Sequence, residues 1–261
     1  MRIALLSDLH GNRIALDAVL HDIETQGGAD AYWVLGDLAA LGPQPVQVLE
    51  RISQLPNVRV TRGNADRYTV SGERPSPTAE EVIANPALLP IFAEVAHTFA
   101  WTQGCLAATG WLTYLEDLPL EQYFQLPDGT RLLGVHASPG SDHGDGLHPR
   151  QKDETVLALL KNCAADLICV GHTHWPMNRR VGQSHVINLG SVSNPVIPDL
   201  KASYALLQAD SSGYTVMHRR VAYDHAAVIE AVRAVRHPAG RFIIDVMQGK
   251  IVRHHWGEPQ V

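Results

Sequence analysis

Apolar-rich runs of strand length alternate with amphipathic stretches of helical spacing at the start of the chain. The runs are residues 2–7, 31–35 and 58–61, and the helical stretches are residues 12–25 and 45–55. Glycines at 27 and 28 end the first helical stretch and Pro45 opens the second, as is common at helix boundaries. Strands that alternate with helices in this order predict βαβ units and a parallel sheet.

The pattern changes after residue 70. Residues from about Ser71 to Gly110 are rich in proline and then carry apolar residues at helical spacing, so we expect a helical insertion at about 71–110 in a single domain of residues 1–261. The later chain favours antiparallel hairpins within residues 123–135, 177–188 and 204–221, with one helix at about 153–163. These elements predict an α/β fold: a four-layer α/β sandwich, with two mixed β-sheets packed face to face and helices outside.

Polar side chains that can bind metals recur just past the ends of the predicted strands. The strings that carry them are SDLHGN, LGDLAALGP, RGNAD, VHASP and VGHTH. Because ligands of open α/β sheets gather at the carboxyl ends of the strands, we expect these side chains to converge. Two carboxylates, one amide and four imidazoles suit two adjacent transition-metal ions. The predicted metal ligands are Asp8, His10, Asp37, Asn64, His136, His172 and His174.

Composition and charge narrow the expected partners. The chain has 261 residues, is 45% hydrophobic and carries a formal charge of -6, which gives no strong signal for nucleic-acid binding. A net negative protein must gather positive charge locally to bind an anionic substrate, and metal ions would do so. Cys105, Cys163 and Cys169 show neither metal nor redox spacing, and no apolar run approaches membrane-spanning length. We therefore expect reduced thiols, a cytoplasmic location and no membrane partner.

The five strings, in this order, resemble the calcineurin-like metallophosphoesterases, whose signature runs D-x-H, G-D, G-N-H-D/E, H and G-H-x-H. Five ordered motifs are far more specific than any one of them. GDLAALGPQP, VINLGSVSNP, ASYALLQAD and HRRVAYD extend the similarity over nearly the whole chain, toward a branch of small bacterial phosphoesterases and phosphodiesterases. The serine/threonine phosphatase branch is less similar, because its Asp-Arg-Gly after the second motif is Ala40-Leu41-Gly42 here.

The resemblance implies how the ligands divide between two ions. The family's pattern gives one ion Asp8, His10 and His174, and the other ion Asn64, His136 and His172. Asp37 has two oxygens and can bridge ions about 3.5–4 Å apart, with one hydroxide between them. The two carboxylates and the hydroxide leave about one positive charge on two divalent ions, which attracts a phosphate. Asp37 and Asn64 are thus expected at the reacting centre, with Asp66 orienting its neighbours by hydrogen bonds.

At three places the sequence differs from the family's motifs at residues that would face a substrate. Ala65 stands where most members have a histidine that supports the transition state and protonates the leaving oxygen. The text after His136 is ASPG in place of G-S-P-R, and the string N-P-G-S-V-G-Q-P-R is NLGSVSNPV at residues 188–196. Two arginines and a histidine are thus absent, while all seven metal ligands remain. We expect the site to hold metal better than it hydrolyses demanding substrates.

Other polar residues near the motifs have a structural and a functional interpretation. Asn12 is expected to cap the first helix and can also contact a phosphate, and Arg13 is a candidate phosphate contact. His143 and His148 lie in the glycine-rich stretch SPGSDHGDGLHP. They either overhang the substrate, with His143 as a candidate acid, or belong to a solvated loop.

The sequence therefore predicts an enzyme, a dinuclear metal-dependent phosphoric ester hydrolase that attacks a small phosphoester with the bridging hydroxide. A phosphodiester or a good leaving group is favoured over an unactivated monoester, because Ala65 supplies no acid. Manganese, iron, zinc or a mixed pair would suit these ligands. The alternative is a catalytically weak metal-binding scaffold of the same fold that docks a protein partner, as the family's protein-sorting member illustrates. The complete ligand set favours the enzyme, whereas Ala65 favours the scaffold.

Overall fold

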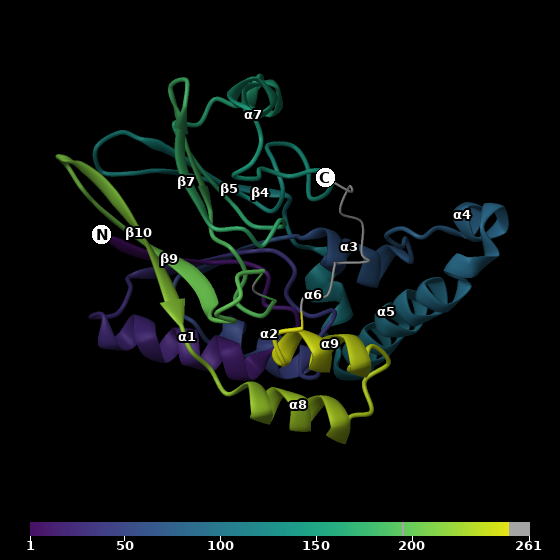
Figure 1. Ribbon diagram of the computed structural model, residues 1–261. Helices are drawn as coiled ribbons and strands as arrows, with labels where there is room; N and C mark the ends of the chain where they lie inside the picture. The colour runs from purple at the N-terminus through teal and green to yellow at the C-terminus, as the bar shows by residue number, and fades with distance from the viewer. Residues whose placement is uncertain (195, 251–261) are drawn as a thin grey trace.

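Two five-stranded mixed sheets pack face to face in the computed structural model, and helices cover their outer faces (Figure 1). The structure describes residues 1–194 and 196–250. The predicted four-layer α/β sandwich is confirmed. For His254 and His255 the sequence predicts an exposed tail, and both lie outside the described residues.

The first sheet has the strand order β10-β9-β1-β2-β3. Its strands are β1 (Arg2–Leu6), β2 (Ala31–Leu35), β3 (Val58–Thr61), β9 (Ala202–Asp210) and β10 (Gly213–Val221). Strands β1, β2 and β3 are parallel, while β9 pairs with β1 and β10 pairs with β9 in antiparallel fashion. The parallel strands β1, β2 and β3 and the antiparallel pair of β9 and β10 agree with the hydrophobic pattern of the sequence.

The second sheet has the strand order β4-β5-β6-β8-β7. Its strands are β4 (Glu121–Gln125), β5 (Arg131–Val135), β6 (Leu167–Val170), β7 (Met177–Val181) and β8 (Ser184–Asn188). Strands β5, β6 and β8 are parallel, and β4 and β7 are antiparallel edge strands. Each sheet thus contains three neighbouring parallel strands, and the candidate ligands follow β1, β2, β3, β5 and β6.

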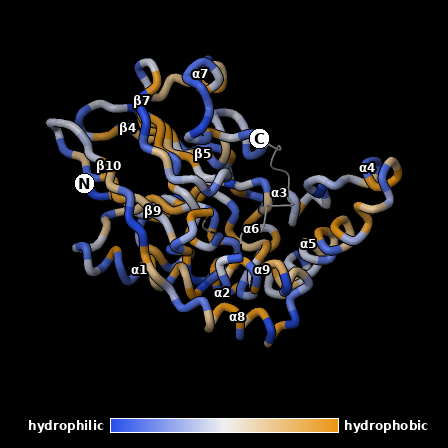
Figure 2. Tube along the Cα trace, in the orientation of Figure 1, coloured by the Kyte–Doolittle hydropathy of each residue, from blue (hydrophilic) through white to orange (hydrophobic). Residues whose placement is uncertain are grey.

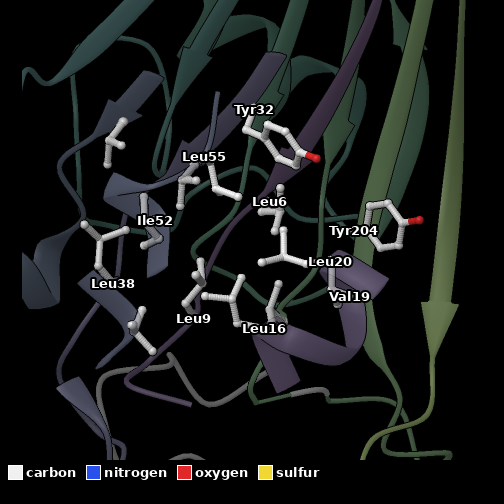
Figure 3. Close-up of a cluster of buried hydrophobic side chains, with 14 of the residues drawn as sticks. Leu6, Leu9, Leu16, Val19, Leu20, Tyr32, Leu38, Ile52, Leu55 and Tyr204 are labelled. Carbon is white, nitrogen blue, oxygen red and sulfur yellow. The ribbon is translucent and has the colours of Figure 1, made fainter. Parts of the chain in front are cut away.

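Both faces of the first sheet are buried. Along β2, Tyr32 and Val34 pack on the outer face, whereas Trp33 and Leu35 pack between the two sheets. Successive strand side chains point to opposite faces, so a continuous apolar strand needs a layer on each side. Figure 3 shows the leucine, valine and isoleucine side chains of α1 (Arg13–Thr25) and α2 (Pro45–Ser53) that complete the outer layer.

The second sheet is covered by α7 (Asp153–Leu160), which packs Val156 and Leu160 against it. The layers therefore run from α1 and α2 through the two sheets to α7. The strands in the middle of the molecule are largely hydrophobic (Figure 2). No helix among the described residues is long and apolar enough to cross a membrane.

Helices fill the chain between β3 and β4. They are α3 (Asn64–Ser71), α4 (Ala79–Ala84), a 3-10 turn (Pro86–Leu88), α5 (Leu89–Thr109) and α6 (Leu112–Glu116). Helix α4 and the adjoining end of α5 extend away from the sheets (Figure 1). The C-terminal part adds the helix pair α8 (His225–Ala234) and α9 (Gly240–Met247).

Four of these helices, α3, α6, α8 and α9, have no counterpart among the predicted elements. Helix α3 begins at Asn64, inside a string that the sequence presents as a ligand turn, and Asp66 in its first turn bonds back to the N-cap backbone. Helix α9 buries Phe242, Ile243, Val246 and Met247, which are spaced as on one helical face. That signal is present in the sequence.

The first testable prediction concerns the packing between the sheets at Gly134 of β5. A Cβ there would lie 2.7 Å from Trp33 Cε3 and 2.8 Å from Leu35 Cδ2. Gly134→Ala should overpack this layer and lower the free energy of unfolding by about 1–3 kcal/mol. Gly104→Ala on α5 is the control, because its Cβ would meet nothing within 4 Å. Urea denaturation measures the free energy of unfolding of both variants. Equal values would show that the two sheets are not closely packed at Gly134.

Candidate metal centre

The structure brings all seven predicted ligands together at the edge where the parallel strands of both sheets end. In the first group, His10 Nε2 lies 3.2 Å from His174 Nε2, which lies 3.2 Å from Asp8 Oδ1. In the second group, Asn64 Oδ1 lies 3.1 Å from His136 Nε2 and 2.9 Å from His172 Nδ1. Their use as metal ligands, and their division between two ions, is a proposal.

Asp37 lies between the two groups. Its Oδ1 is 3.5 Å from His136 Nε2, and its Oδ2 is 3.8 Å from His10 Nε2. The two oxygens thus face different groups, as a bridging carboxylate requires.

Backbone carbonyls fix the proton position on all four imidazoles. His10, His136 and His174 donate from Nδ1 to the carbonyls of Ala40, Leu35 and Asn194, at 3.1, 2.7 and 2.9 Å. His172 donates from Nε2 to the Gly144 carbonyl at 2.8 Å. The other ring nitrogen of each neutral imidazole therefore presents a lone pair to the centre. Such hydrogen bonds orient metal-binding histidines.

A cation fits this arrangement because ring nitrogens, carboxylate oxygens and an amide oxygen, all of them atoms that can bind metals, face one another. His10 Nε2 and His174 Nε2 face each other, and the buried Asp8 Oδ1 lies 3.2 Å from His174 Nε2. Asn64 Oδ1 likewise faces two imidazole nitrogens. Rotating that amide would let its nitrogen donate to both rings, which suits a centre without metal. The orientation with oxygen inward is the one that binds a cation.

Electrostatics support the same conclusion. Burial alone would lower the pKa of His136, but the Asp37 carboxylate outweighs it and raises this pKa to about 10. Burial lowers the pKa of His172 to about 4, with the charge of His136 adding to the effect. The buried carboxylates therefore demand positive charge nearby, which metal ions would provide in place of a proton.

Backbone strain is concentrated at the ligands. Asp8, His10, Asp37, His172 and His174 all have positive φ, between 43° and 66°. For residues other than glycine this left-handed conformation costs about 1–2 kcal/mol each. Strain of this kind persists where the surrounding structure over-determines it, commonly at functional sites.

At two glycines of the motifs, a carboxylate of the centre lies too close to the backbone to leave room for a side chain. A Cβ at Gly63 would lie 2.2 Å from Asp37 Oδ1, and one at Gly171 would lie 2.4 Å from Asp8 Oδ2. Each glycine therefore lets a neighbouring loop come against a carboxylate of the centre.

Asp66 positions the bridging loop. Its Oδ2 accepts the N–H groups of Asp37 and Gly63 at 2.8 and 2.9 Å, and its Oδ1 accepts that of Leu38 at 2.9 Å. The side chain is fully buried. Asp66 thus holds the Asp37 and Asn64 loops together, which supports the orienting role predicted for it.

Hydrogen bonds across the centre also join the two sheets. The His172 N–H from the second sheet donates to Asp8 Oδ2 at 3.1 Å, and His136 reaches the Leu35 carbonyl of β2. The VINLGSVSNP string contributes Asn188 Nδ2, which donates to the Gly171 carbonyl at 2.7 Å, and Ser191 Oγ, which donates to the Asp8 carbonyl at 2.9 Å. Sequence analysis predicts no individual role for Asn188 or Ser191.

A cavity of about 390 Å³ opens over the centre. Its floor includes His10, Asp37, Asn64, His172 and His174. Its apolar and aromatic lining residues are Leu41, Ala65, Tyr68, Pro75, Phe99 and Phe242. Its polar lining residues outside the centre, called the polar wall below, include Asp145, His148, Arg150, Gln151 and Thr155. Apart from Ala65 and His148, these wall residues were not predicted, because they come from helices and loops that only the tertiary fold brings here.

The predicted substrate contacts lie elsewhere. Asn12 is buried and caps α1, accepting the Ala15 N–H at 3.0 Å. Arg13 pairs with Asp17 at 2.6 Å and does not line the cavity. His143 is exposed beside Asp142 and is also absent from the cavity wall. Phosphate contacts by Asn12 and Arg13 and an acid role for His143 stay predictions without geometric support.

Fold and centre together define a metallophosphoesterase, and comparison with known proteins agrees. Residues 1–212 match the family model described as the calcineurin-like phosphoesterase superfamily domain. The chain belongs to this superfamily and is a metal-dependent phosphoester hydrolase. Phe242 lies in α9, beyond the matched residues.

Individual relatives differ in how much of the chain they share. An uncharacterized protein of Methanocaldococcus jannaschii is 29% identical over 255 residues, which is 90% of this chain and 93% of that protein. A metallophosphoesterase structure from Sphaerobacter thermophilus is 27% identical, with a TM-score of 0.73 over 96% of this chain and all of that one. The symmetrical bis(5'-nucleosyl)-tetraphosphatase of Citrobacter koseri is 38% identical over 68 residues, 26% of this chain and 24% of that enzyme.

Asp66 provides the second testable prediction. Asp66→Ala leaves three buried N–H groups without an acceptor and releases the Asp37 loop, so zinc affinity should fall about 10–100-fold. Asp66→Asn should lose less zinc affinity than Asp66→Ala, because its one side-chain oxygen can still accept two of the three hydrogen bonds. Zinc titration against a competing chelator measures both affinities, with Asp117→Ala, at the exposed C-cap residue of α6, as the control. Native affinity in Asp66→Ala would refute the positioning role.

Proposed function

We propose that this chain hydrolyses a phosphodiester at a two-metal centre bridged by Asp37. The observation that carries the proposal is the position of Asp37, whose two oxygens face the two separate groups of acceptor atoms. When bound, the pair of ions would supply a hydroxide nucleophile near neutral pH and positive charge for the phosphoryl oxygens. Manganese, iron and zinc all suit nitrogen and oxygen ligands of this kind.

The side chains of the centre set its charge and shape. Asp8 and Asp37 are the only acids assigned as ligands, and Asn64 contributes an oxygen without a charge. The centre therefore keeps a surplus of positive charge when two divalent ions are bound. Asp66 holds the Asp37 loop in place through backbone N–H groups, so the ligands need little rearrangement on binding.

The walls of the cavity support a diester. Tyr68, Phe99 and Phe242 offer apolar surface beside the centre, where a second organic substituent of the phosphate would be buried. Ala65 adds only a methyl group, so the leaving oxygen receives no proton from position 65. Both features favour a substrate with a bulky, weakly basic leaving group over an alkyl monoester.

We also propose that the segment of about residues 71–110, which contains α4 and α5, is a helical insertion in one domain of residues 1–261. Pro75 and Phe99 place this segment at the cavity. A cytoplasmic location remains a proposal supported by the three cysteines, none of which forms a disulfide.

The third testable prediction concerns the leaving group. On the manganese-loaded protein, rates should fall steeply as the leaving group of an aryl phosphodiester becomes more basic, and alkyl monoesters should be slowest. Positioned acids are worth roughly 10²–10⁴-fold, so Ala65→His should flatten this dependence and help poor leaving groups most. The measurement is kcat/KM across a graded series of phenyl phosphodiesters for both proteins.

Chelation is the control for this series, since activity must disappear with the metal and return with it. Two bound ions without turnover of any diester or monoester would contradict the proposal and favour the scaffold. A shallow slope that Ala65→His does not change would mean that another residue already acts as the acid.

A further inference from the structure

The loop that carries His148 is anchored to the metal centre. The Gly144 carbonyl accepts the His172 Nε2–H at 2.8 Å, and the Leu147 carbonyl accepts Asn188 Nδ2–H at 3.0 Å. Gln151 closes the loop on itself, because its Nε2 donates to the Gly146 carbonyl at 3.0 Å. This stretch, predicted as either a substrate overhang or a solvated loop, is thus fixed on the polar wall of the cavity.

The His148 ring is held in one tautomer. Its Nδ1 accepts the backbone N–H of Arg150 at 3.1 Å, so the proton of the neutral ring is on Nε2. The His148 N–H donates to Gln151 Oε1 at 2.9 Å. The ring meets Trp175 edge-on with centroids 5.7 Å apart, and the Arg150 guanidinium lies 5.3 Å from the Trp175 ring centroid. Orientation and proton position are therefore both specified before a ligand binds.

We propose that His148 donates a hydrogen bond from Nε2 to a phosphoryl oxygen of the bound phosphoester, and that it keeps its proton throughout the reaction. The proposal rests on the proposed function, because the oxygen belongs to the ester held at the metal centre. His148 and the centre line the same cavity, and Arg150 brings a positive charge to the same wall.

The Arg150 N–H explains why His148 acts as a donor and not as an acid. A doubly protonated ring would place an Nδ1–H against that backbone N–H, which is unfavourable. Burial and the nearby Arg150 charge also lower the pKa of His148. A neutral donor stabilises charge on a phosphoryl oxygen, but it delivers no proton to the leaving group.

The test compares four variants of the zinc-loaded full chain. His148→Ala removes the donor, and His148→Gln keeps an N–H on a side chain of similar length. His143→Ala tests the other histidine of the loop, and His21→Ala, at an exposed position on α1, is the control for the same chemical change. The probes are inorganic phosphate, followed by calorimetry, and the graded phenyl phosphodiesters.

We expect His148→Ala to lose phosphate affinity and kcat/KM by similar factors. His148→Ala should weaken phosphate binding and lower kcat/KM by about 10–100-fold, the range for a hydrogen bond to a charged group. The factor should be the same for every leaving group, because no proton is transferred. His148→Gln should recover part of both losses, and His21→Ala should match the native chain. The ¹⁵N spectrum of the native protein should show His148 as the Nε2–H tautomer.

Several results would overturn the proposal. They are unchanged phosphate affinity in His148→Ala, the loss appearing in His143→Ala instead, a penalty that grows with leaving-group basicity, or an Nδ1–H tautomer. If His148→Ala fails to fold, His148→Gln and the native spectrum still decide. Phosphate affinity and the His148 tautomer can be measured on a protein that has no activity. An inactive native protein would therefore refute the proposed function, while these two measurements would still test the role of His148.

Discussion

The structure depends on one electrostatic constraint: Asp8 and Asp37 are buried among four imidazoles, each oriented by a hydrogen bond from one ring nitrogen to a backbone carbonyl. Two negative charges and a set of facing acceptors are unfavourable together in a buried site unless cations lie between them. Five of the seven proposed ligands are also held at positive φ. Metal binding would offset both costs, so the fold presents a centre that is strained and electrostatically incomplete by itself.

The fold can hold this arrangement because the centre lies where both sheets end. Packing between the sheets, with Trp33 and Leu35 on one side and β5 on the other, brings the ends of their parallel strands together. Hydrogen bonds then connect the loops across the sheets, from His172 to Asp8 and from His136 to Leu35. Ligand geometry and domain packing are therefore parts of one structure.

Much of this could be predicted from the sequence, and the failures have physical reasons. Strands β2 and β3 have the predicted bounds, and β5, β7 and β8 lie within the predicted hairpins, because each is an apolar or alternating run between turn residues. The seven proposed ligands could be selected from the sequence because they follow strands in ordered motifs, and the structure brings them together. The cavity walls were not, since Tyr68, Phe99 and Phe242 belong to helices whose apolar residues look like core residues in sequence. His148 was visible only as one of two alternatives, because its role depends on a hydrogen bond from Arg150 that no pattern encodes.

The central claim is that Asp37 joins two metal sites, and metal stoichiometry tests it most directly. Native protein, His10→Ala and Asp37→Ala would be loaded with zinc, desalted and analysed by elemental mass spectrometry, with folding checked by circular dichroism. The account predicts about two ions per native chain, about one in His10→Ala, where the second group remains intact, and fewer still in Asp37→Ala, where both sites lose a ligand. A single ion in the native chain, or two ions retained after loss of Asp37, would contradict it.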